Sequence, residues 1–156
     1  MDDELRDTID TVSLTRLHAA YADTCTRQRW VELRDQFRPD ARVTIDLQNQ
    51  GSLSCDGPDA LGEFIGRSLQ QFDFFEFVVL NSHFMLRTDG DPDRATGRMW
   101  MSELRQFAAT GRWSQIYGLY RDDYVRVGGR WWFAARRYQS LARPNRDIEV
   151  FPIPAD

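Results

Sequence analysis

The sequence predicts an α+β domain in which helices come first and a long antiparallel sheet follows. Over the first part of the chain, apolar residues recur every three or four positions, the period of an amphipathic helix. Beyond Phe72 the apolar residues alternate instead, and turn sequences rich in glycine separate four extended segments. The 156 residues fit one domain of ordinary size. Helices followed by a run of strands favour a sheet that curls over the helices.

The first half of the domain is expected to hold three helices and two short strands. The first helix runs from Leu5 to about Gln28. "WVELRDQF" continues as a short second helix that ends before Pro39, because the residue before a proline avoids helical geometry. "RVTIDL" alternates as a strand. "SLSCDGPDALGEFIGRSLQQF" holds a short strand, a turn at "DGP" and a third helix with the proline near its first turn.

The second half is expected to form an antiparallel meander. The turn sequences "DGDPD", "ATG" and "GG" separate its strands, which are predicted at Glu76 to Thr88, Arg94 to Ala108, Trp113 to Val127 and Arg130 to Leu141. Residues 1–143 therefore form a single domain. Residues 144–156 form an extended C-terminal tail, whose apolar side chains are expected to cover a groove or a neighbouring subunit.

Composition excludes several classes of partner. The chain is 42% hydrophobic and 28% charged, with a net charge of −4, so neither nucleic acid nor a membrane is an expected partner. The N-terminus "MDDELRDTID" is acidic, the opposite of a signal peptide, and a cytoplasmic location is expected. Two cysteines and two histidines at distant places do not form a metal set, and no cofactor is expected.

Four stretches of the chain carry a resemblance to a known family. Together with the order of elements, they resemble the nuclear transport factor 2-like superfamily and, within it, the SnoaL-like group of polyketide cyclases, scytalone dehydratase and lindane dehydrochlorinase. The resemblance covers roughly Thr11 to Leu141. The stretches are "YADTCTRQRWVELRDQFRPDARV", "CDGPDALGEF", "SHFMLRTDGDPDRATGRMWM" and "GLYRDDYVRVGGRWWFAARRY".

The resemblance implies a cone, a bent sheet wrapped around the first helices, with an apolar cavity for a small ring-bearing ligand. It also implies a homo-oligomer, a dimer or trimer. Enzymes of this group use an aspartate at the end of the first helix and a histidine on the facing sheet as an acid/base pair. Here the position of the aspartate is Thr26, and Cys25 stands where the dehydratase has a tyrosine. His83 is the candidate for the histidine.

Strand alternation assigns further residues to the expected cavity. It places Asn81, His83 and Met85 on the face that carries apolar side chains, so that His83 is the predicted general base unless the strand register differs by one. On the next strand Met101, Glu103 and Arg105 share a face. The last two either orient a substrate oxygen or form a solvated pair at the open rim.

The first helix supplies the remaining candidates. His18, Tyr21 and Cys25 share one helix face, which either packs against the sheet or looks into the cavity. Asp23, the acid nearest to Thr26, reaches the cavity only if the helix end is rotated. The other candidate ligand contacts are Trp30 and Tyr120, and the aromatic residues of the sheet serve either the cavity or a subunit interface.

The leading hypothesis is a cofactor-independent lyase, isomerase or cyclase acting on a small hydrophobic ring compound of polyketide, terpenoid or steroid type. His83 is its predicted base, and Tyr21, Asn81 and either Asp23 or Arg105 hold the developing oxyanion. The absence of the family's aspartate at Thr26 leaves a second reading open, a binding protein without turnover. A third is the small subunit of a ring-hydroxylating oxygenase, which shares the fold.

Overall fold

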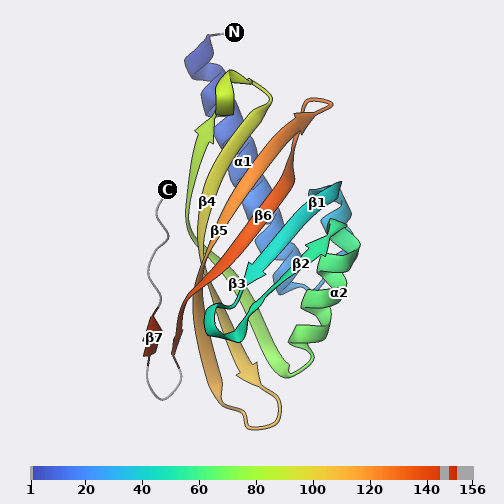
Figure 1. The fold of residues 1–156 in the computed structure, drawn as a ribbon, viewed down its shortest axis with the longest axis vertical. Helices are drawn as coiled ribbons and strands as arrows, with labels where there is room; N and C mark the ends of the chain where they lie inside the picture. Colours follow the sequence, from blue (N-terminus) through green and yellow to red (C-terminus); the bar gives the residue numbers. More distant parts are fainter. Residues whose placement is uncertain (1, 145–147, 151–156) are drawn as a thin grey trace.

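The computed structural model describes residues 2–144 and 148–150 and confirms the α+β cone. One curved sheet packs over a long helix, and a second helix lies beside the first two strands of the chain (Figure 1). In chain order the elements are α1 (Asp3–Thr26), the 3-10 helix η1 (Trp30–Asp35), β1 (Phe37–Asp46), η2 (Gln48–Gln50), β2 (Ser52–Asp56), α2 (Gly57–Leu69), β3 (Phe72–Leu86), η3 (Thr88–Gly90), β4 (Arg94–Phe107), β5 (Trp113–Val127), β6 (Arg130–Pro144) and β7 (Ile148–Val150).

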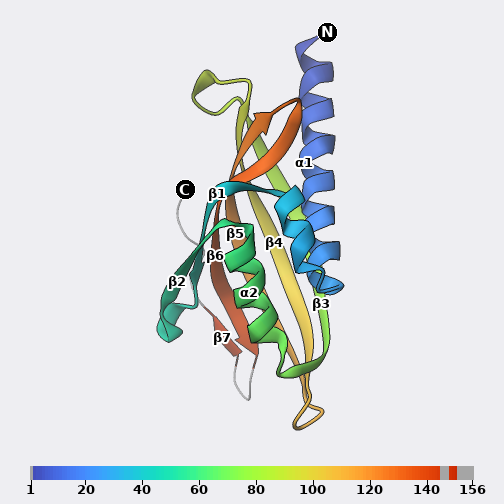
Figure 2. The ribbon, with the colours of Figure 1, turned by 90° about the vertical axis from the view of Figure 1, so that its right-hand side faces the viewer.

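The strands lie side by side in the order β2-β1-β6-β5-β4-β3, with β7 paired to β6. The pair β1 and β6 is parallel and the other pairs are antiparallel. Figure 2 shows α1 and α2 on the same side of the long strands. α1 packs chiefly on β3, and α2 packs on β1 and η1. The rest of the tail predicted at 144–156, residues 145–147 and 151–156, lies outside the described residues.

The expectation of three N-terminal helices is wrong in detail. "WVELRD" forms the single 3-10 helix η1, because six residues are too few to offset the cost of nucleating an α-helix. β1 then begins at Phe37 and contains Pro39, earlier than predicted, and its pairing with β6 is irregular until Arg42. The second true α-helix, α2, follows β1 and β2 in the chain.

A β-bulge in β3 changes which side chains face the interior. Val79 pairs with Met101 and Asn81 pairs with Trp100, so Leu80 is an extra residue on β3. Before the bulge the odd-numbered side chains are inside, as the burial of Phe77 shows. After the bulge the even-numbered side chains turn inward and the odd-numbered ones are exposed.

The cone is filled with side chains at the end near the start of α1. Leu14 and Leu17 of α1 pack there in the same core as residues of β5 and β6, namely Tyr124, Trp131 and Phe133. No helix among the described residues is long and apolar enough to cross a membrane. The filled end leaves the opposite half of the cone, near α2, as the place for a cavity.

Thr26, the last residue of α1, fastens the helix to the edge of the sheet. Its Oγ1 accepts a hydrogen bond from the backbone N–H of Phe77 at 3.0 Å and lies 3.5 Å from the carbonyl oxygen of the same residue. β3 is the last strand of the described sheet, so its outer backbone groups need partners other than a strand. The hydroxyl at the position where the resemblance expects an aspartate therefore pairs with main chain.

Thr26→Val is expected to lower the free energy of unfolding by about 1–3 kcal/mol, because it keeps the side-chain shape but leaves the N–H of Phe77 unpaired. Urea denaturation measures the change. Thr15→Val is the matched control, since Thr15 is an exposed threonine of α1 that bonds only the carbonyl of Thr11 among the described contacts. An equal loss in both variants would show that the bond to β3 contributes nothing specific.

Candidate functional site

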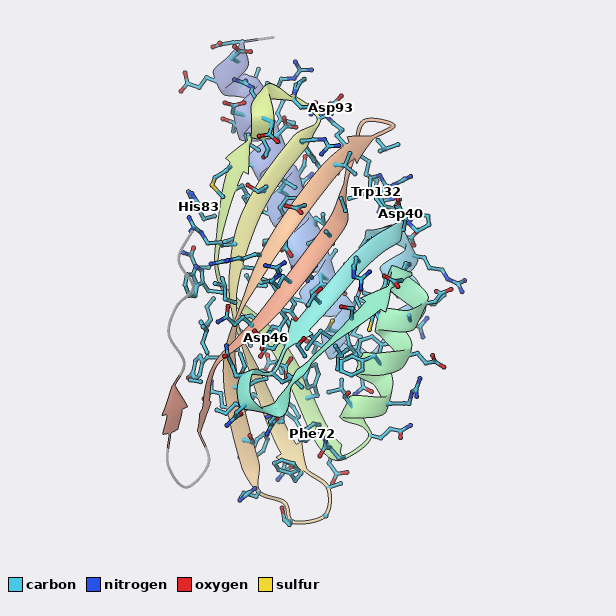
Figure 3. The ribbon with its side chains drawn as sticks, viewed as in Figure 1. Asp40, Asp46, Phe72, His83, Asp93 and Trp132 are labelled. Atoms are coloured by element: carbon cyan, nitrogen blue, oxygen red, sulfur yellow. The ribbon has the colours of Figure 1, made fainter. Side chains whose placement is uncertain are left out.

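A cavity of about 440 Å³ occupies the half of the cone near α2. Its volume lies in the range of sites that hold small organic ligands. Phe72, which is on its wall, lies near the lower end of the molecule in Figure 3. The apolar part of the wall comes from α2, β1, β3 and β5 and includes Val43, Ile45, Leu61, Phe64, Ile65, Leu69, Phe75, Phe77 and Ile116.

β4 and β6 supply the charged groups of the wall and two of its hydroxyls. Glu103 and Arg105 of β4 both line the cavity, with side chains only 17% and 19% exposed. The Glu103 carboxylate lies 3.8 Å from Nη1 of Arg105, an ion pair too long for a good hydrogen bond. Tyr138 and Ser140 of β6 face the same space. The reading of Glu103 and Arg105 as a solvated pair at the rim is therefore wrong.

Burial changes the acidity of Glu103. Removal from water raises its pKa to about 7, against the opposing positive charge of Arg105. The carboxyl is also close enough to raise the pKa of Cys25, Tyr120 and Tyr138 by its charge. A carboxyl group with a pKa of about 7 is present in both its protonated and its ionised form at neutral pH, which suits it to take up and return a proton.

The raised pKa of Glu103 should make the free energy of unfolding depend on pH. Because the folded pKa of Glu103 lies above its ordinary value of 4.5, the folded state holds the proton more tightly, and its stability falls as pH rises from 4.5 to about 7. Glu103→Gln should therefore gain stability relative to the unmodified protein over this window, by at most about 1.4 kcal/mol per pH unit. Denaturation series at several pH values measure the difference. A difference that does not change with pH would contradict the assignment.

Gly118 of β5 lets Tyr138 reach across the sheet. A Cβ atom at Gly118 would lie 2.3 Å from the Tyr138 ring and 2.8 Å from its hydroxyl oxygen, so the ring lies directly on the glycine. Gly118 pairs with Met101 of β4 and Ser140 of β6. The absent side chain thus brings a hydroxyl from β6 toward the polar groups of β4.

Gly118→Ala is expected to push the Tyr138 ring out of place and to lower the free energy of unfolding by about 1–3 kcal/mol. Thermal or urea denaturation measures the loss. Adding Tyr138→Ser to this variant removes the clash and should recover part of the loss. If the double variant is less stable than the sum of the two single changes, the clash is not the cause.

A buried ion pair lies behind the cavity wall. Arg136 donates to both oxygens of Asp122, with Nε to Oδ1 at 2.6 Å and Nη2 to Oδ2 at 2.8 Å, and both side chains are fully buried. The guanidinium carbon lies 4.3 Å from the ring centre of Tyr21 and 4.1 Å from that of Tyr120. A permanent positive charge therefore lies against the two tyrosine rings of the cavity wall.

His18 continues this network away from the cavity. Its Nε2 lies 2.5 Å from the Tyr124 hydroxyl and its Nδ1 lies 2.7 Å from the Ser82 hydroxyl. Because Tyr124 donates its only proton to Asp122 at 2.9 Å, it accepts from Nε2–H, and Nδ1 accepts from Ser82. Burial lowers the pKa of His18, although Asp122 opposes the shift, so the ring is neutral near pH 7. His18 is a structural member of the filled core.

Five of the predicted site residues lie on the cavity wall: Tyr21, Cys25, Glu103, Arg105 and Tyr120. Burial raises the pKa of the Cys25 thiol to about 12, so Cys25 is no nucleophile near neutral pH. Burial also raises the pKa of Tyr21 and of Tyr120 well above the usual value, and both remain hydroxyl donors. The roles predicted for these residues remain predictions.

The predicted inward orientation of His83 is wrong. The bulge at Leu80 turns His83, Asn81 and Met85 to the outer face, where all three are exposed. Figure 3 shows His83 at the edge of the sheet, pointing away from it. Asp23 also lies outside the cavity, 63% exposed, and pairs with Arg27 at 2.7 Å. The helix end is therefore not rotated to bring Asp23 inside.

The other predicted contacts do not line the cavity either. Met101 is fully buried in the core, and Thr26 bonds the backbone of β3. Trp30 packs on α2, where its indole nitrogen would meet a Cβ at Gly66 at 3.0 Å.

The residues that sequence reasoning missed are Ser140, Arg143 and the pair Asp122 and Arg136. The alternation of Arg136, Tyr138 and Ser140 along β6 was the available signal, but nothing local marks a buried arginine in a chain with 20 basic residues.

Comparison with known proteins gives the same architecture. A family model described as a SnoaL-like domain matches residues 6–137. A hexachlorocyclohexane dehydrochlorinase from Novosphingobium barchaimii has 15% identity and a TM-score of 0.76, over 91% of this chain and 93% of that one. A protein assigned as a scytalone dehydratase from Novosphingobium aromaticivorans has 17% identity and a TM-score of 0.75, over 96% and 93%. At these identities the structures share the fold. No curated protein matches the sequence.

Proposed function

Because the chain belongs to the SnoaL-like domain family and its apolar cavity carries one largely buried carboxyl group, we propose that it is a cofactor-independent lyase, isomerase or cyclase for a small hydrophobic ring compound. The observation that carries the proposal is the position of Glu103 on the cavity wall, close to Cys25, Tyr120 and Tyr138. The solved structures named as a dehydrochlorinase and a dehydratase have the same fold, which is consistent with a lyase-type reaction.

In this proposal Glu103 takes the place that the sequence assigns to His83. The ionised carboxylate removes a proton from a ring carbon or from a carbon next to a carbonyl group. The negative charge then moves to a ligand oxygen, which Tyr21 and Tyr120 hold by hydrogen bonds. The charge of Arg136 against the two rings supports these donors. Proton transfer of this kind can proceed with side chains alone.

One observation favours a non-catalytic binding protein as the second candidate. Thr26 bonds the backbone of β3, and Asp23 pairs with Arg27 outside, so the acid/base pair implied by the family resemblance is absent from the cavity. If Glu103 serves only to orient a ligand, the cavity holds the compound without converting it.

Deuterium exchange separates the two candidates without knowledge of the natural substrate. A tetralone, a fused-ring ketone, is incubated with the protein in heavy water, and loss of the proton signal next to the carbonyl is followed by NMR while calorimetry measures binding. Binding with accelerated exchange supports the enzyme. Binding without exchange supports the binding protein and contradicts the enzyme. If calorimetry shows no binding of the tetralone, of other fused-ring ketones or of fused-ring hydrocarbons, both the enzyme and the binding protein are contradicted.

A homo-oligomer, a dimer or trimer, remains a prediction. The outer face of the sheet carries exposed apolar side chains that would be available for such a contact: Phe74, Leu80, Trp113 and Tyr117. Sedimentation equilibrium measures the mass, and a monomer throughout the micromolar range would contradict the expectation.

A further inference from the structure

One wall of the cavity carries more hydrogen-bond donors than the protein itself uses. Ser140 is 1% exposed and Tyr138 is 6% exposed. Neither hydroxyl oxygen has a hydrogen-bond partner among the described residues. The Ser140 hydroxyl is close enough to lower the pKa of Tyr138, although the two oxygens are not placed for a hydrogen bond that satisfies either of them. Buried polar groups are normally paired, so two unpaired hydroxyls on a cavity wall point to a ligand.

Arg105 adds a charged donor to the same wall. A guanidinium group has five N–H donors. Among the described residues Arg105 makes one hydrogen bond, a long one of 3.3 Å from Nη2 to Ser114, and its buried Nε has no partner. Its guanidinium carbon lies 4.9 Å from the ring centre of Phe72, which holds the group in place by stacking. The unused donors remain available to a ligand in the cavity.

The charges around this wall favour an anion. Arg143 also lines the cavity and bonds the carbonyl of Leu47 and the side chain of Asn49. Its charge lowers the pKa of Arg105 and of Tyr138, so the two guanidinium groups are close together. Glu103 is the nearest acid to Arg105, and its ion pair at 3.8 Å leaves most of the Arg105 donors unused.

We propose that the ligand of this cavity is an amphipathic acid, whose carboxylate is held by Arg105, Ser140 and Tyr138 while its rings lie against the apolar residues of α2 and β3. This inference rests on the proposed function and names its substrate class. A carboxylate has two acceptor oxygens with room for about four hydrogen bonds, which matches a guanidinium group and two hydroxyls. The apolar wall opposite, with Leu61, Phe64 and Phe75, takes the hydrocarbon part.

The test compares naphthoate with its methyl ester, which has the same rings but no charge. Calorimetry at neutral pH should show naphthoate bound about tenfold to a hundredfold more tightly than the ester, the effect of charge-assisted hydrogen bonds. Equal binding, or tighter binding of the ester, would overturn this inference and leave the proposed function intact. If neither compound binds, both fail.

Variants assign the preference to the wall. Arg105→Gln should abolish the preference for the acid and leave the affinity for the ester within about twofold. Arg112→Gln is the matched control, because Arg112 is an exposed arginine outside the cavity that stacks on Phe107. Ser140→Ala removes one donor with little change in packing and should weaken naphthoate alone, by about fivefold. An unchanged ratio of acid to ester affinity in both Arg105→Gln and Ser140→Ala would overturn the assignment.

Discussion

Asp122→Asn should lower the free energy of unfolding by about 3–5 kcal/mol, the largest loss of stability expected for this chain. The substitution leaves the fully buried guanidinium group of Arg136 without a counterion and removes an acceptor from Tyr124. Burial alone would raise the pKa of Asp122, but the charge and hydrogen bonds of Arg136 outweigh burial and hold it below the usual value. The pair is therefore ionised at neutral pH.

Urea denaturation followed by tryptophan fluorescence measures this loss. Asp123→Asn is the matched control, since Asp123 is the next residue on the same strand but is exposed on the outer face, and its replacement should change stability by less than about 1 kcal/mol. Replacing both partners, by Asp122→Leu with Arg136→Met, should recover much of the loss because neither charge of this pair then remains buried. Similar losses for Asp122→Asn and Asp123→Asn would show that the ion pair is not what stabilises this region.

Glu103→Gln should slow the protein-dependent deuterium exchange of a tetralone by about a hundredfold to ten-thousandfold, the usual contribution of a general base. Glutamine keeps the shape of the side chain but cannot accept the proton, so binding of the ketone should change little. In the unmodified protein the exchange rate should rise with pH and level off above about 7, as the Glu103 carboxyl ionises.

Two further variants make this result specific. His83→Gln should leave the exchange unchanged, because the His83 ring is exposed on the outer face. Glu76→Gln removes an exposed acid from β3 and should also have no effect. Loss of exchange in His83→Gln with full activity in Glu103→Gln would reverse the assignment of the base and return it to the histidine that the sequence favours.

The sequence predicts the sheet better than the site, and the reason is the range of the interactions involved. Strands β4, β5 and β6 follow from local alternation and turn residues, and they begin where predicted. The side of β4 that carries Glu103 and Arg105 also follows from alternation, because β4 has an unbroken register with β5 from Arg94 to Gln106. A regular strand transmits its pattern along its whole length.

The orientation of His83 could not be predicted because one residue decides it. "FVVLNSHF" contains no glycine or proline that would mark a bulge, and the extra residue Leu80 is visible only in the pairing of β3 with β4. Four elements of the folded cone likewise bring together one network of contacting side chains, namely Arg136, Asp122, His18 and Ser82. No spacing along the chain encodes it.

The extra residue in β3 has an evolutionary consequence. If the same chain paired without the bulge, every residue after Val79 would move one place along β4, so that His83 would stand opposite Gly97 on the inner face and Ser82 would meet solvent. Related chains that lack this bulge without a deletion would turn a different residue inward at the same alignment position, so inheritance of a catalytic histidine in this segment has to be judged from strand pairing.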